Sequence, residues 1–122
     1  MANVEEFVQN GKNFIYIDFS DMKSNDDFIS FTAMVEPIIA KHPKNSVYTI
    51  TNVEDIRFDS GSKEIVAKYL ENNKPYVKFG AIIGLDGIKK VIIETVLRLS
   101  GRRNLHFAFS KDSAIEWLLK QD

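Results

Sequence analysis

The chain has 122 residues, 44% of them hydrophobic and 27% charged, which fits one globular domain with its own core. The 16 Lys and Arg nearly balance the 17 Asp and Glu, so the overall charge points to neither nucleic acid nor an anionic membrane as a partner. The absence of cysteine excludes disulfides, thiolate catalysis and cysteine-ligated zinc. No apolar run is long enough for a membrane span and no signal peptide is visible, so the sequence predicts a cytoplasmic protein.

The first predicted elements are a β-hairpin and a helix. Asn10-Gly11 separates the strand-like segments 4–8 and 13–19, and this dipeptide favours a two-residue hairpin turn because both residues tolerate a positive φ. Ser24 or Asn25 is then a suitable N-cap for a helix that Pro37 should kink near its end. The apolar residues of that helix follow the helical period: Phe28, Phe31, Val35, Ile38 and Ile39.

The rest of the chain alternates strands with helices. Strands are predicted at 47–51, 76–83 and 105–109, and helices from Ser60 or Ser62 to 71, at 88–99 and at 112–120. Asp86 and Ser110 are predicted N-caps, and Gly101 is a predicted left-handed C-cap. The order β-β-α-β-α-β-α-β-α predicts a single α/β domain, with a mixed, mostly parallel sheet of about five strands, the hairpin at its edge, and four helices.

The segment 46–66 lies at the centre of this pattern. It reads as a strand, a loop, and a helix entered through Asp59-Ser60-Gly61-Ser62. Hydroxyl and carboxylate side chains at a helix start are good N-caps, because their oxygens accept hydrogen bonds from the free backbone N–H groups. Asp59, Ser60 or Ser62 is therefore expected to cap the central helix.

The order of elements, together with the segment from Tyr48 to Ser62, resembles the STAS family, the sulfate-transporter and anti-sigma-factor-antagonist domains. Members of that family place a strand, a loop and an Asp-Ser-Ser-Gly-Leu helix entry in mid-chain. The second half looks like a bacterial branch of small stand-alone STAS-like proteins that is similar in fold to lipid-transfer domains. The segments that carry this second likeness are Lys74-Pro75-Tyr76, 81–84, 87–90 and 114–118.

The resemblance implies a regulatory role for the helix entry. In the antagonists a kinase partner phosphorylates a serine of this motif, and Ser60 here matches the first serine. Gly61 stands where the family has its second serine, and Ser62 stands where it has glycine. A phosphate at this position would meet the positive end of a helix. Two interpretations stay open: Ser60 or Ser62 is a phosphoacceptor, or these residues only cap the helix.

A second candidate surface follows the strand at 76–83. Gly84, Asp86 and Gly87 form a turn at the carboxyl end of that strand, where ligands of open α/β sheets bind, and Lys89 and Lys90 add positive charge. The alternative is a tight turn with a capped helix. Acidic residues at the strand ends could suggest a magnesium-dependent phosphoacceptor site, but no basic residue is clearly placed there to neutralise the phosphate, so they are expected to cap turns and helices. The sequence as a whole implies no metal, no cofactor and no catalytic residues.

The helix at 88–99 completes this candidate surface. Six residues are expected to face the sheet: Ile88, Val91, Ile92, Thr95, Val96 and Leu99. At about 100° per residue, Ile93 and Leu97 then point away from the core, either exposed for a partner or covered by another segment. The sequence therefore predicts a non-enzymatic, STAS-like interaction module. Its expected partner is a kinase, an anti-sigma factor or a second subunit, and the alternative is a small apolar-ligand or lipid-binding domain.

Overall fold

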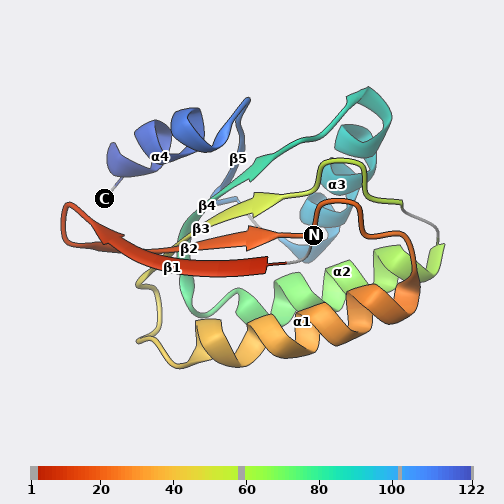
Figure 1. Ribbon diagram of the computed structural model, residues 1–122, viewed down its shortest axis with the longest axis horizontal. Helices are drawn as coiled ribbons and strands as arrows, with labels where there is room; N and C mark the ends of the chain where they lie inside the picture. Colours follow the sequence, from red (N-terminus) through yellow and green to blue (C-terminus); the bar gives the residue numbers. More distant parts are fainter. Residues whose placement is uncertain (1–2, 58–59, 102, 122) are drawn as a thin grey trace.

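The structure, a computed structural model, describes residues 3–57, 60–101 and 103–121, without the side chains of Ser60 and Ser100. Strands and helices alternate along these residues as the sequence predicted (Figure 1). The strands are β1 (Asn3–Gln9), β2 (Lys12–Asp18), β3 (Val47–Asn52), β4 (Val77–Ile83) and β5 (Leu105–Phe107). The helices are α1 (Asn25–Ala40), α2 (Ser60–Asn73), α3 (Gly87–Ser100) and α4 (Lys111–Leu119).

The strands lie side by side in the order in which they occur in the chain. β1 pairs with β2 in antiparallel orientation, and β2, β3, β4 and β5 pair in parallel, which confirms the predicted mixed sheet. Successive parallel strands are joined by right-handed crossovers, and here each crossover steps in the same direction across the sheet. This topology places α1, α2 and α3 on one face, while α4 follows the last strand and packs on the other (Figure 1).

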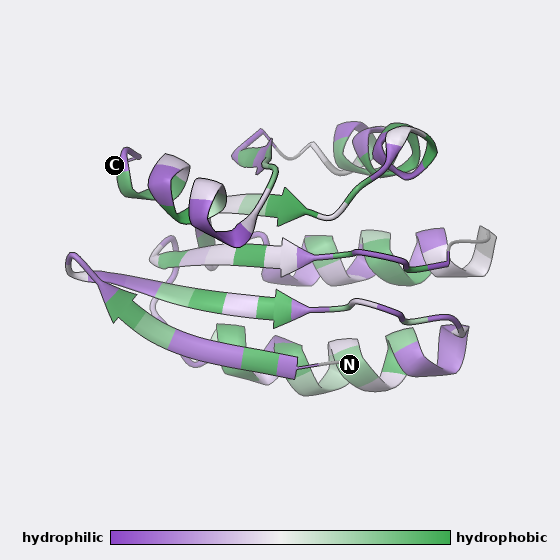
Figure 2. Cartoon of the chain, turned by 45° about the horizontal axis from the view of Figure 1, so that its top comes forward, coloured by the Kyte–Doolittle hydropathy of each residue, from purple (hydrophilic) through white to green (hydrophobic). Residues whose placement is uncertain are grey.

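Each face of the sheet has its own hydrophobic layer. Along β2, Ile15 and Ile17 point toward α1 and α2, whereas Phe14 points toward α4. This alternation makes both faces of the central strands apolar, as expected of a sheet covered on both sides (Figure 2). On the second face, Ala114 and Leu118 of α4 are fully buried.

The predicted hairpin turn and the predicted caps of α1, α3 and α4 are formed. Asn10 and Gly11 adopt φ values of 52° and 75° in the hairpin turn. The Ser24 hydroxyl accepts a hydrogen bond from the Asp27 backbone N–H at 3.1 Å, and Ser110 caps α4 in a reciprocal arrangement with Ser113. These local signals are strong because each satisfies backbone groups that a helix end leaves free.

Helix α1 continues past Pro37 to Ala40 and includes Ile38 and Ile39, as the apolar period predicted. At the last strand the boundary differs from that expected. Strand β5 ends at Phe107, and the side chain of Phe109, expected within the strand, is fully exposed. Because β5 is only three residues long, the sheet offers little surface beneath α3 at this edge.

The orientation of α3 corrects the sequence prediction. Ile93 and Leu97, expected to face away from the core, are 4% and 7% exposed. Ile88, Val91 and Leu99, expected to face the sheet, are 78%, 63% and 84% exposed. The prediction assigned the richer apolar stripe of this helix to the core. In the structure α3 lies at the edge of the helical layer, and the narrower stripe with Ile93 and Leu97 is enough to fill its contact with α2 and the sheet.

Candidate functional site

The loops after β2 and β3 are fastened together at the carboxyl edge of the parallel strands. The Arg57 backbone N–H donates to the Met22 carbonyl oxygen at 3.0 Å. The Lys23 ammonium donates to the Asp55 carbonyl oxygen at 3.1 Å. These bonds bring two basic side chains, Lys23 and Arg57, to the same side of the sheet edge as the start of α3.

The predicted helix entry lies partly outside the described residues. Asp59 belongs to the segment that the structure does not describe, and Ser60 is the first residue of α2. Ser62 is only 2% exposed, and its hydroxyl donates to the Asn25 side-chain oxygen at 2.7 Å. Ser62 therefore joins the start of α2 to the start of α1, and its hydroxyl is not presented at the surface.

The turn before α3 is a capped helix start. Gly84 has a φ of 87°, and the Asp86 carboxylate accepts from the Lys89 backbone N–H at 3.1 Å. The Lys89 ammonium lies 3.8 Å from the same carboxylate, whereas the Lys90 ammonium lies 5.3 Å from the centre of the Phe107 ring. The two lysines thus point to different neighbours, and only Lys89 borders the carboxyl edge of the sheet.

A groove runs between α2 and α3, on the outside of the helical layer. It has a volume of about 460 Å³, and we call it the α2–α3 groove. Its α3 side is formed by Val91, Ile92, Thr95, Val96 and Leu99. Its α2 side is formed by Lys63, Glu64, Ala67 and Glu71. The groove therefore has an apolar wall and a charged rim of both signs.

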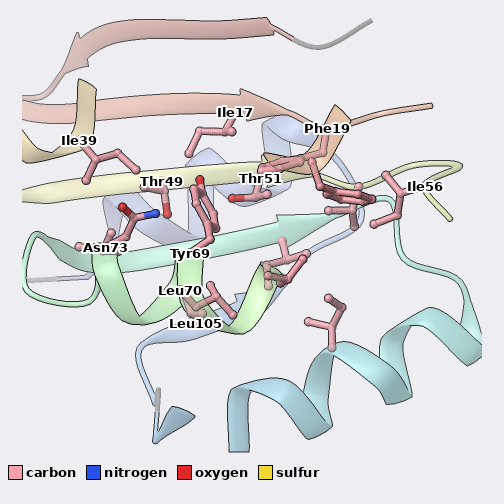
Figure 3. A pocket seen from close by; sticks show the side chains of 16 residues that line it. Ile17, Phe19, Ile39, Thr49, Thr51, Ile56, Tyr69, Leu70, Asn73 and Leu105 are labelled. Carbon is pink, nitrogen blue, oxygen red and sulfur yellow. The ribbon is translucent and has the colours of Figure 1, made fainter. Parts of the chain in front are cut away.

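A separate interior cavity lies between the sheet and the helical layer (Figure 3). Its volume is about 60 Å³, and aliphatic and aromatic side chains supply most of its lining, among them Ile17, Phe19, Ile56, Val66 and Ile93. The few polar groups in its wall come from Thr49, Thr51, Tyr69 and Asn73. A wall with this composition suits an apolar ligand or none, because water in a cavity needs several polar partners.

A third hollow, the basic depression, lies at the carboxyl edge and has a volume of about 320 Å³. Its lining consists of Lys23, Asp55, Ile56, Arg57, Ile88, Lys89 and Ile92. Among the described lining residues, three cationic side chains accompany the carboxylate of Asp55, and the Asp86 carboxylate lies 3.8 Å from the Lys89 ammonium, so the cationic groups outnumber the carboxylates and favour an anionic group.

The described part of the chain offers no arrangement suited to a metal ion. Within residues 3–57, 60–101 and 103–121, no three Asp, Glu or His side chains gather as ligands would. Among the same residues, no helix has the length and apolar character needed to cross a bilayer.

Comparisons with known proteins identify the fold. No family model matches the chain, and no curated protein matches its sequence. The structure is similar to the crystal structure of an uncharacterized protein from the DUF3478 family of Shewanella loihica PV-4, which has a SpoIIAA-like fold. The two share 13% sequence identity, with a TM-score of 0.69 over 96% of this chain and 93% of the other. The chain therefore has a SpoIIAA-like, STAS-like fold, as its sequence predicted.

The structure separates the residues of the predicted partner surface. Gly84, Asp86, Gly87 and Lys89 lie together at the carboxyl edge, but Ile93 and Leu97 belong to the core. Sequence reasoning missed the contribution of Lys23 and Arg57 to the basic depression, because only tertiary contacts bring their loops together. It also missed the exposed face of α3, although a helix with apolar residues on both sides was visible in the sequence.

Proposed function

We propose that the protein is a non-enzymatic, STAS-like interaction module that binds a protein partner through the outward face of α3 and the α2–α3 groove. The observation that carries this proposal is the apolar surface that Ile88, Val91 and Leu99 leave in solvent. A helix with apolar residues both toward and away from its own core is typical of an element covered on both sides (Figure 2). Contiguous exposed aliphatic surface with a polar rim marks interaction sites.

The rim of the groove favours a protein over a bilayer as the partner. Lys63, Glu64 and Glu71 surround the apolar wall from the α2 side, and Glu94 and Arg98 follow on α3. An anionic membrane would repel the three carboxylates, whereas a mixed rim around an apolar centre is the usual composition of a protein interface. The geometry thus supports a partner that presents an apolar element of its own.

The double substitution Val91→Glu with Leu99→Glu tests the surface. It should weaken partner binding by about 30-fold or more, because the loss of a central contact costs on the order of 2 kcal/mol. The partner would first be captured from the native cells, then purified and measured by isothermal titration calorimetry. Ile29→Glu with Met34→Glu is the matched control, since both residues are exposed apolar positions on α1. Equal affinities for the two double variants would remove α3 as the docking surface.

The same variants also test whether the partner is a second copy of this chain. Size-exclusion chromatography with light scattering would show a dimer for the unmodified protein and a monomer for the α3 variant. A monomer in both cases leaves a different protein as the partner.

We further propose that phosphorylation at Ser60 regulates docking. Ser60 begins α2, one turn before the groove residues Lys63 and Glu64, and a phosphate there would add negative charge beside the rim. Ser62 is a poorer acceptor, because its hydroxyl is buried against Asn25. Ser60→Asp should change the affinity for the captured partner, while Ser30→Asp on α1 should not. An unphosphorylated Ser60 in protein from native cells, with equal affinities for both variants, would reject the switch.

A second candidate function is the binding of a small apolar ligand in the interior cavity. Unfilled core volume costs about 24 cal/mol per Å³. The cavity of 60 Å³ therefore corresponds to about 1.4 kcal/mol that a ligand would recover. Native mass spectrometry of freshly purified protein should show a co-purified apolar compound, and Val66→Phe, which fills the cavity, should abolish it. If both the unmodified protein and the variant showed only the mass of the chain without a ligand, this result would count against the function.

A further inference from the structure

The interior cavity and the basic depression share one wall. The side chain of Ile56 lines both hollows, and it is 2% exposed. On one side of Ile56 lie the aliphatic side chains between the sheet and α2, including Val66 and Ile93. On the other side lie Arg57 and Lys89. The apolar interior and the cationic depression therefore adjoin at Ile56.

The loop that carries Ile56 is held by its backbone. Asp55 adopts a φ of 56°, and the Arg57 N–H bonds to Met22, so the residues on both sides of Ile56 are fixed. The Ile56 N–H lies 3.4 Å from the Val53 carbonyl oxygen, which closes a tight turn around it. The backbone around Ile56 is therefore held in place, and its side chain is a shared part of the wall of both hollows.

Charge gives the site its selectivity. Lys23, Arg57 and Lys89 all line the depression, and Asp55 is the one carboxylate among its described lining residues. The Lys89 ammonium also lies 3.8 Å from the Asp86 carboxylate, so part of its charge is already balanced. The Lys23 ammonium donates to the backbone carbonyl oxygen of Asp55, and this hydrogen bond does not neutralise its positive charge. The planar guanidinium group of an arginine can bind two oxygens of a carboxylate or phosphate at once, and two lysine ammonium groups add further positive charge.

We propose that the two hollows together bind an anionic amphiphile with a short hydrocarbon chain. The chain occupies the interior cavity past Ile56, and the carboxylate or phosphate monoester lies in the basic depression. This inference rests on the second candidate function, the apolar ligand in the cavity, and adds the chemistry of its head group. It leaves the part of the outward face of α3 formed by Val91 and Leu99 available for a protein partner, because these two residues line neither hollow, whereas Ile88 borders the basic depression.

The test titrates the full chain, freed of co-purified compounds, with hexanoate, hexyl phosphate, hexanol and hexylamine. Binding is followed by the NMR signals of the methyl groups of Ile56, Val66 and Ile93. Both anions should bind more tightly than hexanol, and hexylamine should bind least. The triple variant Lys23→Gln, Arg57→Gln, Lys89→Gln should weaken hexanoate about tenfold and leave hexanol unchanged. Its matched control removes the same charge from exposed positions elsewhere: Lys44→Gln, Lys68→Gln, Lys120→Gln.

The outcomes separate the head group from the cavity. Equal affinities for hexanoate and hexanol, unaffected by the triple variant, would overturn the head-group proposal and leave the cavity ligand standing. No shift of the cavity methyl signals with any of the probes would overturn both. Flotation of the protein with phosphatidylglycerol vesicles, without a shift at Ile56, would assign the basic side chains to a membrane surface and also overturn the proposal. Thermal unfolding of each variant confirms that it is folded.

Discussion

At Gly84 the turn after β4 comes very close to the loop after β3. A Cβ atom at this position would lie 2.7 Å from the Glu54 backbone nitrogen and 2.8 Å from the Asn52 side-chain oxygen. The Asn52 oxygen already accepts a hydrogen bond from the Glu54 N–H at 3.0 Å, so neither atom is free to move aside. With a φ of 87°, Gly84 is also in a conformation that other residues rarely adopt.

Gly84→Ala should therefore destabilise the protein by about 2 kcal/mol or more, the sum of the left-handed backbone cost and the steric overlap. Gly87→Ala is the matched control, because a Cβ there meets nothing within 4 Å and the residue is the first of α3. Urea unfolding of the two variants measures the difference. Similar midpoints for both would mean that the turn relaxes at little cost.

Glu6, in the middle of the edge strand β1, supplies a pH-dependent contact. Its carboxylate lies 2.7 Å from the Lys41 ammonium and 3.0 Å from the His42 ring nitrogen. The hydrogen bond from Lys41, with a smaller one from His42, lowers the pKa of Glu6 below its usual value of 4.5. A carboxyl group with a lowered pKa stabilises the fold above its unfolded pKa, and this stabilisation is lost as the pH falls through the folded value.

Glu6→Gln should accordingly reduce stability at pH 7 by about 0.5 kcal/mol, a small effect because the pair is exposed to solvent. The difference between the variant and the unmodified protein should shrink as the pH falls below 4.5. Urea unfolding at a series of pH values checks this. A difference that is constant with pH would assign the effect to packing instead of charge.

Helix α3 illustrates which parts of an element a sequence determines. Its start at Asp86 and its end at Gly101 were predictable, because the cap side chain and the left-handed glycine act locally. Its orientation was not, because apolar residues occur on both sides of the helix and the choice depends on neighbours. The neighbours are α2 and the short strand β5, whose length the sequence overestimated.

Two leucines of α3 test that orientation directly. Leu97→Ala should cost about 2–5 kcal/mol, as expected for a buried leucine, since Leu97 is 7% exposed. Leu99→Ala should change stability by less than about 0.5 kcal/mol, since Leu99 is 84% exposed. The opposite ranking in thermal or urea unfolding would mean that α3 packs through the stripe that its sequence favoured.

At the scale of the whole molecule, the fold was more predictable than the site. The alternation of strands and helices, with right-handed crossovers, limits the arrangement to a parallel sheet with an antiparallel edge. The basic depression instead depends on Lys23, Arg57 and Lys89, which come from three different loops or helix starts. No local pattern in the sequence connects these residues, and the pairing of the loops after β2 and β3 is what brings them together.

Helix α4 covers the second face of the sheet, and Lys12 fastens it there. The Lys12 ammonium, at the start of β2, donates to the carbonyl oxygens of Leu118 at 3.4 Å and Leu119 at 3.0 Å, and also to that of Gln121. These carbonyl groups lie at or just beyond the end of α4, where free acceptors and the negative end of the dipole favour a cation. A helix of nine residues is marginal by itself, so its packing and this contact must hold it in place.

Lys12→Met keeps the length of the side chain and removes the charge. It should lower global stability by about 1.5–3 kcal/mol, since hydrogen bonds to a charged group contribute this much. Hydrogen exchange should accelerate more in α4 than in α2, because the Lys12 ammonium contacts the end of α4 and, at 5.0 Å from the ring centre, Tyr48 of β3. Lys120→Met is the control: Lys120 is exposed and its ammonium lies 3.6 Å from Glu116, within the same helix. Equal exchange rates in the two variants would mean that Ala114 and Leu118 hold α4 on the sheet through packing alone.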